Sequence, residues 1–159
     1  MSITVLKPGL QSTIQDLGRY NYSHFGISAS GAADRLSLQI GNLLVGNNKY
    51  TSAIEMTIIG GEFQFNIDCF IAISGSEFDA VLDSTRITNQ KAIKVNKGQT
   101  LSVGQTKTGA RAYLCVQGGI DVKSYLSSKS THVLSGIGGH FGRPIIKGDV
   151  LKFGKNNNN

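Results

Sequence analysis

The stretch ARAYLCVQGGID, residues 110–121, decides the fold that we expect for this chain. Within it, Ala112, Leu114 and Val116 would face one side of a strand, and the residues between them would face the other side. Both faces are largely apolar, which is typical of a central strand covered on both sides. The strand ends at Gly118-Gly119, where the backbone can take a positive φ or approach another group closely. These glycines fit either a tight turn or a binding site at the end of a buried strand.

The composition is that of a globular chain with many turns. Its 159 residues suit one domain or two small ones. Hydrophobic residues make up 40%, enough for a core, whereas charged residues make up only 16%, below the usual level of about 25%. The 20 glycines and 2 prolines favour short strands joined by turns over a disordered or collagen-like chain.

The formal net charge of +6 favours acidic partners in general. The basic residues are scattered, however, whereas nucleic-acid binding usually needs a clustered patch. The N-terminal residues lack the basic and apolar segments of a signal peptide, and no apolar stretch approaches the roughly 18 residues of a membrane span. We therefore expect a cytoplasmic protein that binds neither nucleic acid nor membrane.

The cysteines and histidines give no sign of a metal site. Cys69 and Cys115 each lie inside an apolar run, so we expect buried free thiols. A disulfide between them is open on spacing alone, although nothing suggests an oxidising compartment. His24, His132 and His140 show no zinc-like spacing with each other or with the cysteines.

One helix is predicted, over residues 32–45. Its apolar residues fall at positions i, i+4, i+7 and i+8, which makes one stripe that we expect to face the core: Leu36, Ile40, Leu43 and Leu44. Asp34 lies near the start of this helix, where the helix dipole favours a carboxylate. Two short strands, 3–6 and 12–17, precede the helix. Between them and the helix lies a long polar loop, residues 18–31, whose length is typical of a functional loop.

The rest of the chain is predicted to be strand-rich. The expected strands are 53–59, 62–66, 70–74, 79–82, 91–95 and 100–103, with turns at 60–61, 75–76, 83–84 and 96–98. Strands at such short spacing predict a mainly β protein, an antiparallel barrel or sandwich. Residues 122–143 form a Gly- and Ser-rich loop, 149–153 a final short strand, and 155–159 a polar tail.

Standard catalytic signatures are absent. The segment GQTKTG, residues 104–109, partly matches a phosphate loop but lacks the Gly-Lys-Ser/Thr ending that places the lysine and the magnesium ligand. The glycines between 136 and 142 do not have the spacing of a dinucleotide fingerprint. Ser30 is not in a nucleophile elbow.

Three groups of polar loop residues remain as candidates for a site. Residues 15–19 and 30–35 offer charged groups and a hydroxyl around a helix N-terminus, which suits an anion; alternatively, Asp34 only caps the helix and Arg19 pairs with Asp16. Residues 117–121 form the second group. Residues 127–132 and 138–143 form the third, which fits either an oxyanion site or a mobile polar loop.

These loops also carry a resemblance to a known family. The matching segments are QDLGR (15–19), SGA (30–32) with Asp34, NLLVGN (42–47), EMT (55–57), AISG (72–75), RAYL (111–114), GGID (118–121), ST (130–131), GR (142–143) and GD (148–149). The chain resembles the C subunit of 5-oxoprolinase, a family also called KipA, allophanate hydrolase subunit 2 or the biotin-dependent carboxyltransferase domain. It departs from that family at Ala33, where Met is usual, and at Lys129 and His132, where Arg and Tyr are common. Family members are about twice as long, and the match covers their N-terminal half.

The resemblance implies a cyclophilin-like closed antiparallel β-barrel over residues 1–154. It implies one part of an ATP-dependent 5-oxoprolinase, which opens 5-oxo-L-proline to L-glutamate with an A subunit, and with a B subunit that is KipI-like. ATP would lie on, or be shared with, a partner subunit. No catalytic residue is assigned; the residues expected to bind the small-molecule substrate are Arg19, Ser30, Asp34, Gln117, Gly118, Gly119, Ser130, Thr131, His132 and Arg143.

Two other functions fit the same resemblance. One is a KipA-type regulator that binds and antagonises a KipI-like kinase inhibitor, in which case the barrel surface would matter most. The other is the carboxyltransferase part of a urea carboxylase or allophanate hydrolase system. The chain has no Met-Lys-Met biotin-attachment motif, so any biotin would arrive on another chain. In these proteins the substrate cleft is expected between barrel domains, and this chain would supply one wall.

Overall fold

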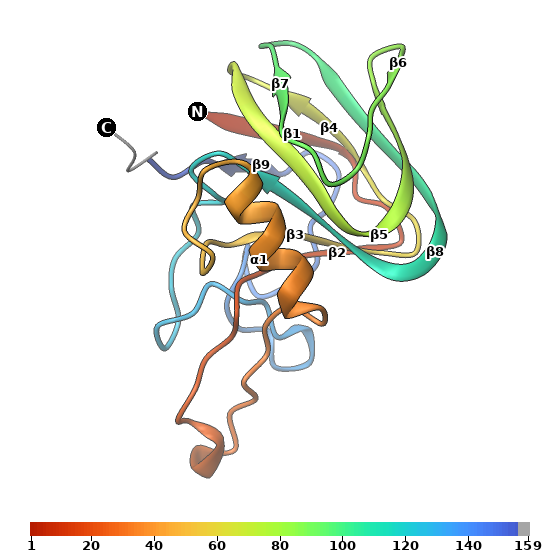
Figure 1. The fold of residues 1–159 in the computed structure, drawn as a ribbon. Coiled ribbons are helices and arrows are strands. Elements are labelled where there is room, and N and C mark those ends of the chain that lie inside the picture. The colour runs from red at the N-terminus through yellow and green to blue at the C-terminus, as the bar shows by residue number, and fades with distance from the viewer. Residues whose placement is uncertain (156–159) are drawn as a thin grey trace.

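A computed structural model describes residues 1–155 and shows a mainly β protein with one α-helix. The described strands pair antiparallel in one nine-stranded sheet that curls into a half-barrel (Figure 1). This confirms the predicted fold class. The strands are β1 (Ser2–Lys7), β2 (Gln11–Gln15), β3 (Ala53–Thr57), β4 (Glu62–Phe65), β5 (Cys69–Leu82), β6 (Thr85–Arg86), β7 (Ile93–Val95), β8 (Thr100–Val116) and β9 (Val150–Lys152). The helix is α1 (Arg35–Leu44), and two 3-10 turns are η1 (Ser23–Phe25) and η2 (Val133–Ser135).

Strand β8 organises the sheet, as the pattern of residues 110–121 predicts. The strand order is β2-β3-β8-β4-β1-β9, and β5 pairs with β8, β6 and β7. The C-terminal part of β8 pairs with β3, from Ile54–Leu114 to Thr57–Arg111, while its N-terminal part pairs with β4. Its residues 112–116 are all buried, because the curled core covers one face and α1 covers the other.

The two longest strands correct the predicted boundaries. Residues 69–82 form one strand, whereas the sequence predicts two strands with a turn at Gly75-Ser76. Gly75 has a positive φ of 95°, but the chain continues through it as a bulge, with register shifts against β8 on the residues that follow. Likewise, residues 104–109, which separate two of the predicted strands, are part of one long strand, β8. Both errors have one physical cause, because a glycine at positive φ serves a bulge as well as a turn.

The core has two parts. The larger lies inside the curl of the sheet and contains the buried aliphatic and aromatic residues of β1, β4, β5 and β8, among them Ile3, Phe63, Phe65 and Leu101. The smaller lies between α1 and the outer face of the sheet, where Leu38 packs with Ala72, Tyr113 and Cys115. Cys69 and Cys115 are free and buried, as predicted. Burial raises the pKa of the Cys115 thiol to about 12.

Helix α1 is shorter than predicted, and it presents the opposite face to the core. Asp34 is its N-cap, so residues 32–34 lie outside it. The predicted apolar stripe points largely to solvent: Leu36 is 67% exposed, Ile40 39% and Leu43 61%. The buried residues are Leu38, Gly41 and Asn42. The reason is that the sheet beneath the helix carries small side chains, so the side of the helix that contains Gly41 can pack closely on it.

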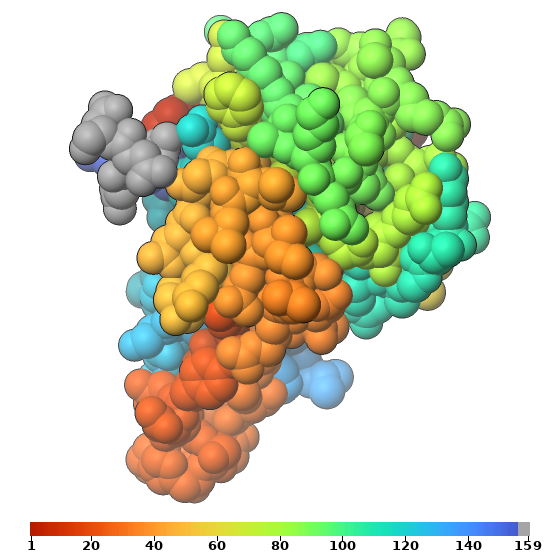
Figure 2. All heavy atoms as spheres, viewed as in Figure 1, coloured from red at the N-terminus to blue at the C-terminus, as the bar shows by residue number. Residues whose placement is uncertain are grey.

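The long loops before α1 and after β8 gather at one end of the sheet (Figure 1). The segment around η1 projects from the body of the molecule, and the loops of residues 120–148 run beside its base (Figures 1 and 2). No helix within residues 1–155 is long and apolar enough to cross a membrane. The predicted polar tail, apart from Lys155, lies outside the described residues.

Candidate functional site

Asp16 is the centre of a buried junction between loops. It directly follows β2, and its carboxylate accepts hydrogen bonds from the hydroxyls of Ser128 (2.7 Å) and Ser130. It also accepts from the backbone N–H groups of Gly18 (2.8 Å) and Lys129 (2.6 Å). Both serines are buried almost completely. The carboxylate therefore fixes a loop more than a hundred residues away against the end of β2.

Arg19 joins the same junction from the other side. Its guanidinium donates to the Ser30 hydroxyl at 2.9 Å, to the Ser130 carbonyl and, at 3.5 Å, to the Tyr125 carbonyl. The side chain is only 2% exposed, and this burial lowers the pKa of Arg19, while the nearby Asp16 carboxylate opposes the shift. Arg19 thus uses neutral oxygen acceptors in place of the ion pair with Asp16 that the sequence left open.

A polar cleft of about 820 Å³ lies beside this junction. The residues that line it come from the end of β2, from α1 and the loop after it, and from the loops after β8 and β9: Asp16, Leu43, Gly46, Asn47, Asn48, Tyr50, Thr51, Ser52, Gly118, Asp121, Ser124, Ser127, Lys129, Gly154 and Lys155. The Lys129 ammonium, on a side chain that is 31% exposed, is 3.2 Å from the Asp121 carboxylate. The cleft therefore offers a cation that Asp121 positions, while the other carboxylate lining it, Asp16, already accepts four hydrogen bonds. Within residues 1–155, no cluster of three or more His, Cys, Asp or Glu side chains could hold a metal ion.

The glycine turn after β8 forms one wall of the cleft. Gly118 and Gly119 both have positive φ, 85° and 69°. The Gly118 N–H donates to Asn47 Oδ1 at 2.8 Å, and Asn47 Nδ2 donates to the Val116 carbonyl at 2.7 Å. A Cβ at Gly118 would collide with the carbonyl oxygen of Gly154. The turn lacks side chains because the backbone of Gly154 packs directly on it, and the Asn47 amide fixes its position.

A second buried polar pair places the start of α1. The Tyr113 hydroxyl donates to the Glu55 carboxylate at 2.7 Å and accepts from the Asp34 N–H at 2.7 Å. The same carboxylate accepts from the Ala33 N–H at 2.8 Å. Burial, and secondly the Glu55 charge, raise the pKa of Tyr113 far above its ordinary value, so the hydroxyl stays a donor. The Asp34 carboxylate accepts from the Ser37 N–H, which is the capping role that the sequence allowed.

The structure brings the three predicted loop groups together, but it gives their members different positions. Gly118 lines the cleft, and Gln117 and Gly119 flank it in the chain. Arg19, Ser30 and Ser130 build the junction that supports it. Three further predicted residues use their side chains in internal contacts away from the cleft. Thr131 donates to the Ile14 carbonyl of β2, whereas His132 and Arg143 bind the nearby Ser135 and Asp149.

Three residues of the site are not among the residues predicted to bind the substrate. The sequence offers Asp16 as a partner of Arg19 and Lys129 as part of an oxyanion-binding loop group, and Asn47 was not a candidate for the site. One signal for Asp16 is available in the sequence: a carboxylate directly after a buried strand must find donors in another loop. For Asn47, the signal is an amide that directly follows the helix-ending Gly46. Nothing in the sequence indicates that Lys129 faces a cleft, because that depends on loops far apart in the chain.

The Arg143–Asp149 pair holds the last loop in place and predicts a pH dependence of stability. The guanidinium binds both carboxylate oxygens, at 2.8 and 2.9 Å. This pairing holds the pKa of Asp149 below its usual range, although burial opposes the shift. A lowered folded-state pKa means that the contribution to stability is complete above the unfolded value of about 4 and is lost as the pH falls through the folded value.

We expect Asp149→Asn to lower the Tm at pH 7, and we expect the gap from the unchanged protein to close progressively below roughly pH 4. Thermal unfolding between pH 7 and pH 3 measures this. A gap that stays constant over that range would contradict the assignment.

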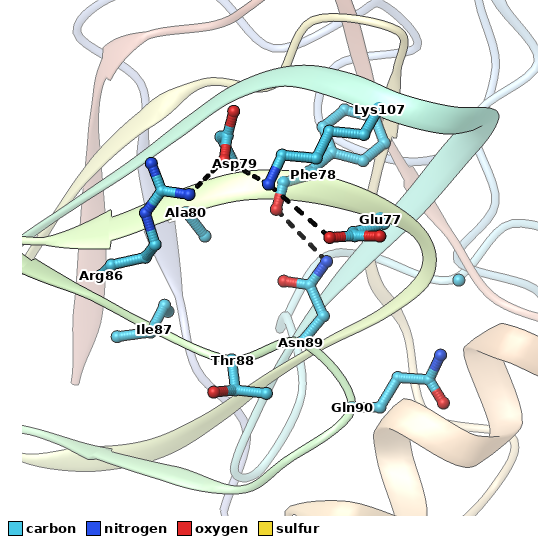
Figure 3. Close-up of a pocket in the computed structure, with 11 residues that line it drawn as sticks. Glu77, Phe78, Asp79, Ala80, Arg86, Ile87, Thr88, Asn89, Gln90 and Lys107 are labelled. Carbon is cyan, nitrogen blue, oxygen red and sulfur yellow. Dashed lines mark hydrogen bonds and ion pairs between the residues drawn. The ribbon is translucent and has the colours of Figure 1, made fainter.

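A second cavity, of about 590 Å³, lies where β5 bends over the segment between β6 and β7 (Figure 3). Lys107 lies 2.9 Å from Asp79 and 3.6 Å from Glu77, and Arg86 lies 3.1 Å from Asp79 (Figure 3). This pairing lowers the pKa of Asp79 and raises that of Lys107. Two acidic and two basic groups neutralise one another here, so the cavity offers no net charge for a ligand.

Comparison with known proteins places the chain in a family. The family model for the carboxyltransferase domain, subdomain A and B, matches residues 25–159. The chain belongs to the carboxyltransferase A and B domain family. This family match confirms the resemblance found in the loop motifs.

Relatives of this carboxyltransferase domain are parts of larger proteins. This chain is 41% identical to the urea amidolyase of Saccharomyces cerevisiae over 99% of its own length and 9% of that protein. It is 39% identical to the 5-oxoprolinase C subunit of Haemophilus influenzae over 94% of the chain and 48% of that protein. The crystal structure of the Kluyveromyces lactis urea carboxylase superposes with a TM-score of 0.94 at 39% identity, over 96% of this chain and 14% of that one. The chain thus spans about half of the 5-oxoprolinase relative and a small part of the urea enzymes.

Proposed function

We propose that this domain is one carboxyltransferase-type part of an ATP-dependent 5-oxoprolinase that opens 5-oxo-L-proline to L-glutamate together with the A and B subunits of that enzyme. The observation that carries the proposal is the match to the C subunit of a 5-oxoprolinase over almost the whole chain. We assign ATP to a partner subunit, because the segment that partly matches a phosphate loop, residues 104–109, is part of strand β8.

The polar cleft beside Asp16 is the proposed substrate site, of which this chain supplies one wall. The substrate 5-oxo-L-proline carries a carboxylate and a lactam carbonyl, and both accept hydrogen bonds from a cation. Lys129, held at the cleft by Asp121, is suited to bind one of them. Asp16 acts as a positioning residue, since its carboxylate already accepts four hydrogen bonds. In this proposal Arg19, Ser30 and Ser130 shape the site through the junction.

The test uses a chimaera in which this chain replaces the matching half of the Haemophilus influenzae C subunit. Combined with the A and B subunits of that organism, ATP and 5-oxo-L-proline, the chimaera is expected to form L-glutamate. Lys129→Ala should lower kcat/KM at least about tenfold, since one charge-assisted hydrogen bond is lost. Lys94→Ala, on an exposed lysine of β7, is the matched control. Equal activity of both variants would remove Lys129 from the site.

A urea carboxylase function is the second candidate, favoured by the 41% identity to a urea amidolyase and the 0.94 TM-score to a urea carboxylase. The two functions differ in their need for biotin, which would be carried by another chain. Avidin added to the assembled system would stop carboxyl transfer to urea and leave lactam opening unchanged. Product formation from each substrate, with and without avidin, therefore decides between them.

A further inference from the structure

The turn at Leu126-Ser127 has a strained backbone and lies at the edge of the polar cleft. Tyr125 and Ser128 exchange two backbone hydrogen bonds, of 2.8 and 3.2 Å, so the two residues between them form a tight hairpin turn. Leu126 and Ser127 both have positive φ, 50° and 61°. A turn of this kind normally contains Asn-Gly or Asp-Gly, because the Cβ of other residues is crowded at positive φ. Leucine and serine therefore hold a backbone conformation that they disfavour.

Hydrogen bonds on both sides keep the turn in this conformation. The Tyr125 carbonyl accepts from the Arg19 guanidinium at 3.5 Å, and the Ser128 hydroxyl donates to the Asp16 carboxylate at 2.7 Å. The Lys129 N–H donates to the same carboxylate at 2.6 Å. The buried junction thus imposes the conformation on the turn. Backbone strain that the surrounding structure maintains is typical of functional sites.

The two side chains of the turn have different surroundings. Leu126 is half-buried and lines a small hollow of about 270 Å³ with Tyr20 and Tyr22. Ser127 is exposed and lies between this hollow and the polar cleft, which Lys129 also lines. The Ser127 hydroxyl makes no hydrogen bond to another residue of the described part of the chain, 1–155. Internal contacts therefore give a reason for Leu126, but none for a serine in place of glycine at position 127.

A hydroxyl at this position complements the charged groups of the cleft. The Lys129 ammonium only donates hydrogen bonds, the Asp16 carboxylate already accepts four, and the Asp121 carboxylate binds Lys129. The Ser127 hydroxyl can both donate and accept. In 5-oxo-L-proline, the proposed substrate, the ring N–H is a donor that lies directly beside the carbonyl, an acceptor. Ser127 and Lys129 offer partners of these two kinds in one cleft.

We propose that Ser127 determines specificity in the cleft: its hydroxyl accepts a hydrogen bond from the N–H of a cyclic amide, while Lys129 binds a carbonyl or carboxylate oxygen of the same molecule. The strain of the turn follows from this use, since glycine would relax the backbone but remove the hydroxyl. The inference rests on the proposed function for its substrate and adds the group of that substrate that is recognised. A ring of the same shape without the N–H loses this hydrogen bond and binds less tightly.

The experiment compares Ser127→Gly with the unchanged protein in two settings, the isolated chain and the chimaera with the Haemophilus influenzae second half. Glycine is not crowded at positive φ, so we expect the Tm of the isolated chain to rise by about 2 °C. In the chimaera, we expect the KM for 5-oxo-L-proline to rise about fivefold with an unchanged kcat, since a hydrogen bond to a non-reacting group is lost equally from bound substrate and transition state.

Gln90→Gly is the matched control. Gln90 is exposed and has a φ of 58°, so glycine relieves the same kind of strain there. It lines the cavity at the bend of β5 and not the polar cleft (Figure 3). We therefore expect a similar rise in Tm and no change in KM. An equal rise in KM for both variants would overturn the proposal, as would an unchanged KM for Ser127→Gly.

The lactone analogue of 5-oxo-L-proline, in which a ring oxygen replaces the N–H, separates recognition from a change of shape. As a competitive inhibitor, it should bind the unchanged chimaera and the Ser127→Gly chimaera equally, within about twofold, because neither forms the hydrogen bond. A loss of affinity for the lactone as large as that for the lactam would mean that the substitution distorts the cleft, and it would overturn the proposal.

An unchanged chimaera without turnover would contradict the proposed function, and binding to the isolated chain then decides the role of Ser127. The backbone N–H signals are followed by NMR during titration with 5-oxo-L-proline and with the lactone. A shift of the Ser127 signal that is larger with the lactam supports the proposal. Equal shifts, or none, would overturn it. A fall in Tm for Ser127→Gly would also overturn it, because the hydroxyl would then hold the turn itself.

Discussion

Replacing Asp16 with alanine is expected to lower the free energy of unfolding by about 3 kcal/mol, or the Tm by roughly 10 °C. The substitution leaves four buried or half-buried donors without their acceptor: two serine hydroxyls and two backbone N–H groups. Each unpaired buried donor costs about 1–3 kcal/mol, and relaxation of the loop recovers part of the total. Urea denaturation at pH 7 measures the change.

Two variants serve as controls for Asp16. Asp16→Asn keeps one carbonyl oxygen but turns an NH₂ toward the Lys129 N–H, so we expect an intermediate loss. Asp121→Ala removes a carboxylate that lines the same cleft but is 58% exposed and pairs only at the surface, so its cost should be below about 0.5 kcal/mol. If the Asp16 and Asp121 variants were equally stable, the junction would not be what holds residues 128–130.

Gly41→Val is the second substitution with a large expected effect, a loss of about 3 kcal/mol. A glycine inside a helix normally costs stability relative to alanine, by about 1 kcal/mol, so most replacements there are favourable. At Gly41 the sign reverses, because a side chain would overlap Ser74 and Cys115 and push α1 off the sheet. Thermal unfolding, together with near-UV circular dichroism of Tyr113 beneath the helix, measures this.

A double substitution tests the cause of this loss. Ser74→Ala removes the hydroxyl that lies nearest to the new side chain, so it should restore part of the stability of Gly41→Val. The restoration stays partial, since Cys115 Sγ remains in contact and since Ser74 also loses its hydrogen bond to the Ser37 carbonyl. A Gly41→Val variant as stable as the unchanged protein would contradict the close packing.

Much of the sheet could be predicted, because the pattern of apolar residues within a strand identifies it without reference to the rest of the chain. Alternation and apolar faces identify β1 and the C-terminal half of β8, and both lie where the sequence predicts. Strand length was less predictable, since Gly75 has the same φ in a bulge as it would have in a turn. Whether a chain bends or reverses at such a glycine depends on the partner strand, which is distant in sequence.

Helix α1 shows what the periodicity of a sequence does not determine. Its periodicity correctly predicts one helix but not which side is buried, because the choice depends on the sheet beneath. Small residues there, Ala72, Ser74 and Cys115, accept the Gly41 side and leave the larger apolar side chains outside. The rule that the apolar stripe faces the core therefore fails for α1, because the small side chains of the sheet select the glycine face of the helix.

For the candidate site, the structure brings the predicted loops together, but the sequence did not indicate which of their residues are used in internal hydrogen bonds. Arg19, Ser30 and Ser130 have the chemistry of substrate-binding groups, yet each is used in an internal hydrogen bond. Residue type alone cannot separate these two uses, because a buried guanidinium and a ligand-binding one need the same acceptors. The distinction comes from burial, which only the assembled loops define.

The bond between Ser130 and Asp16 joins positions 114 residues apart, and β1 pairs with β9 near the other end of the chain. Such pairings form slowly, since a long segment must be ordered before they close. During translation, residues 1–127 would leave the ribosome while Asp16 still lacks three of its four donors and Arg19 still lacks the Ser130 carbonyl as an acceptor. The junction beside the candidate cleft therefore forms late, and a nascent chain interrupted before residue 128 would contain most of the sheet but not the three donors from residues 128–130 that bind Asp16.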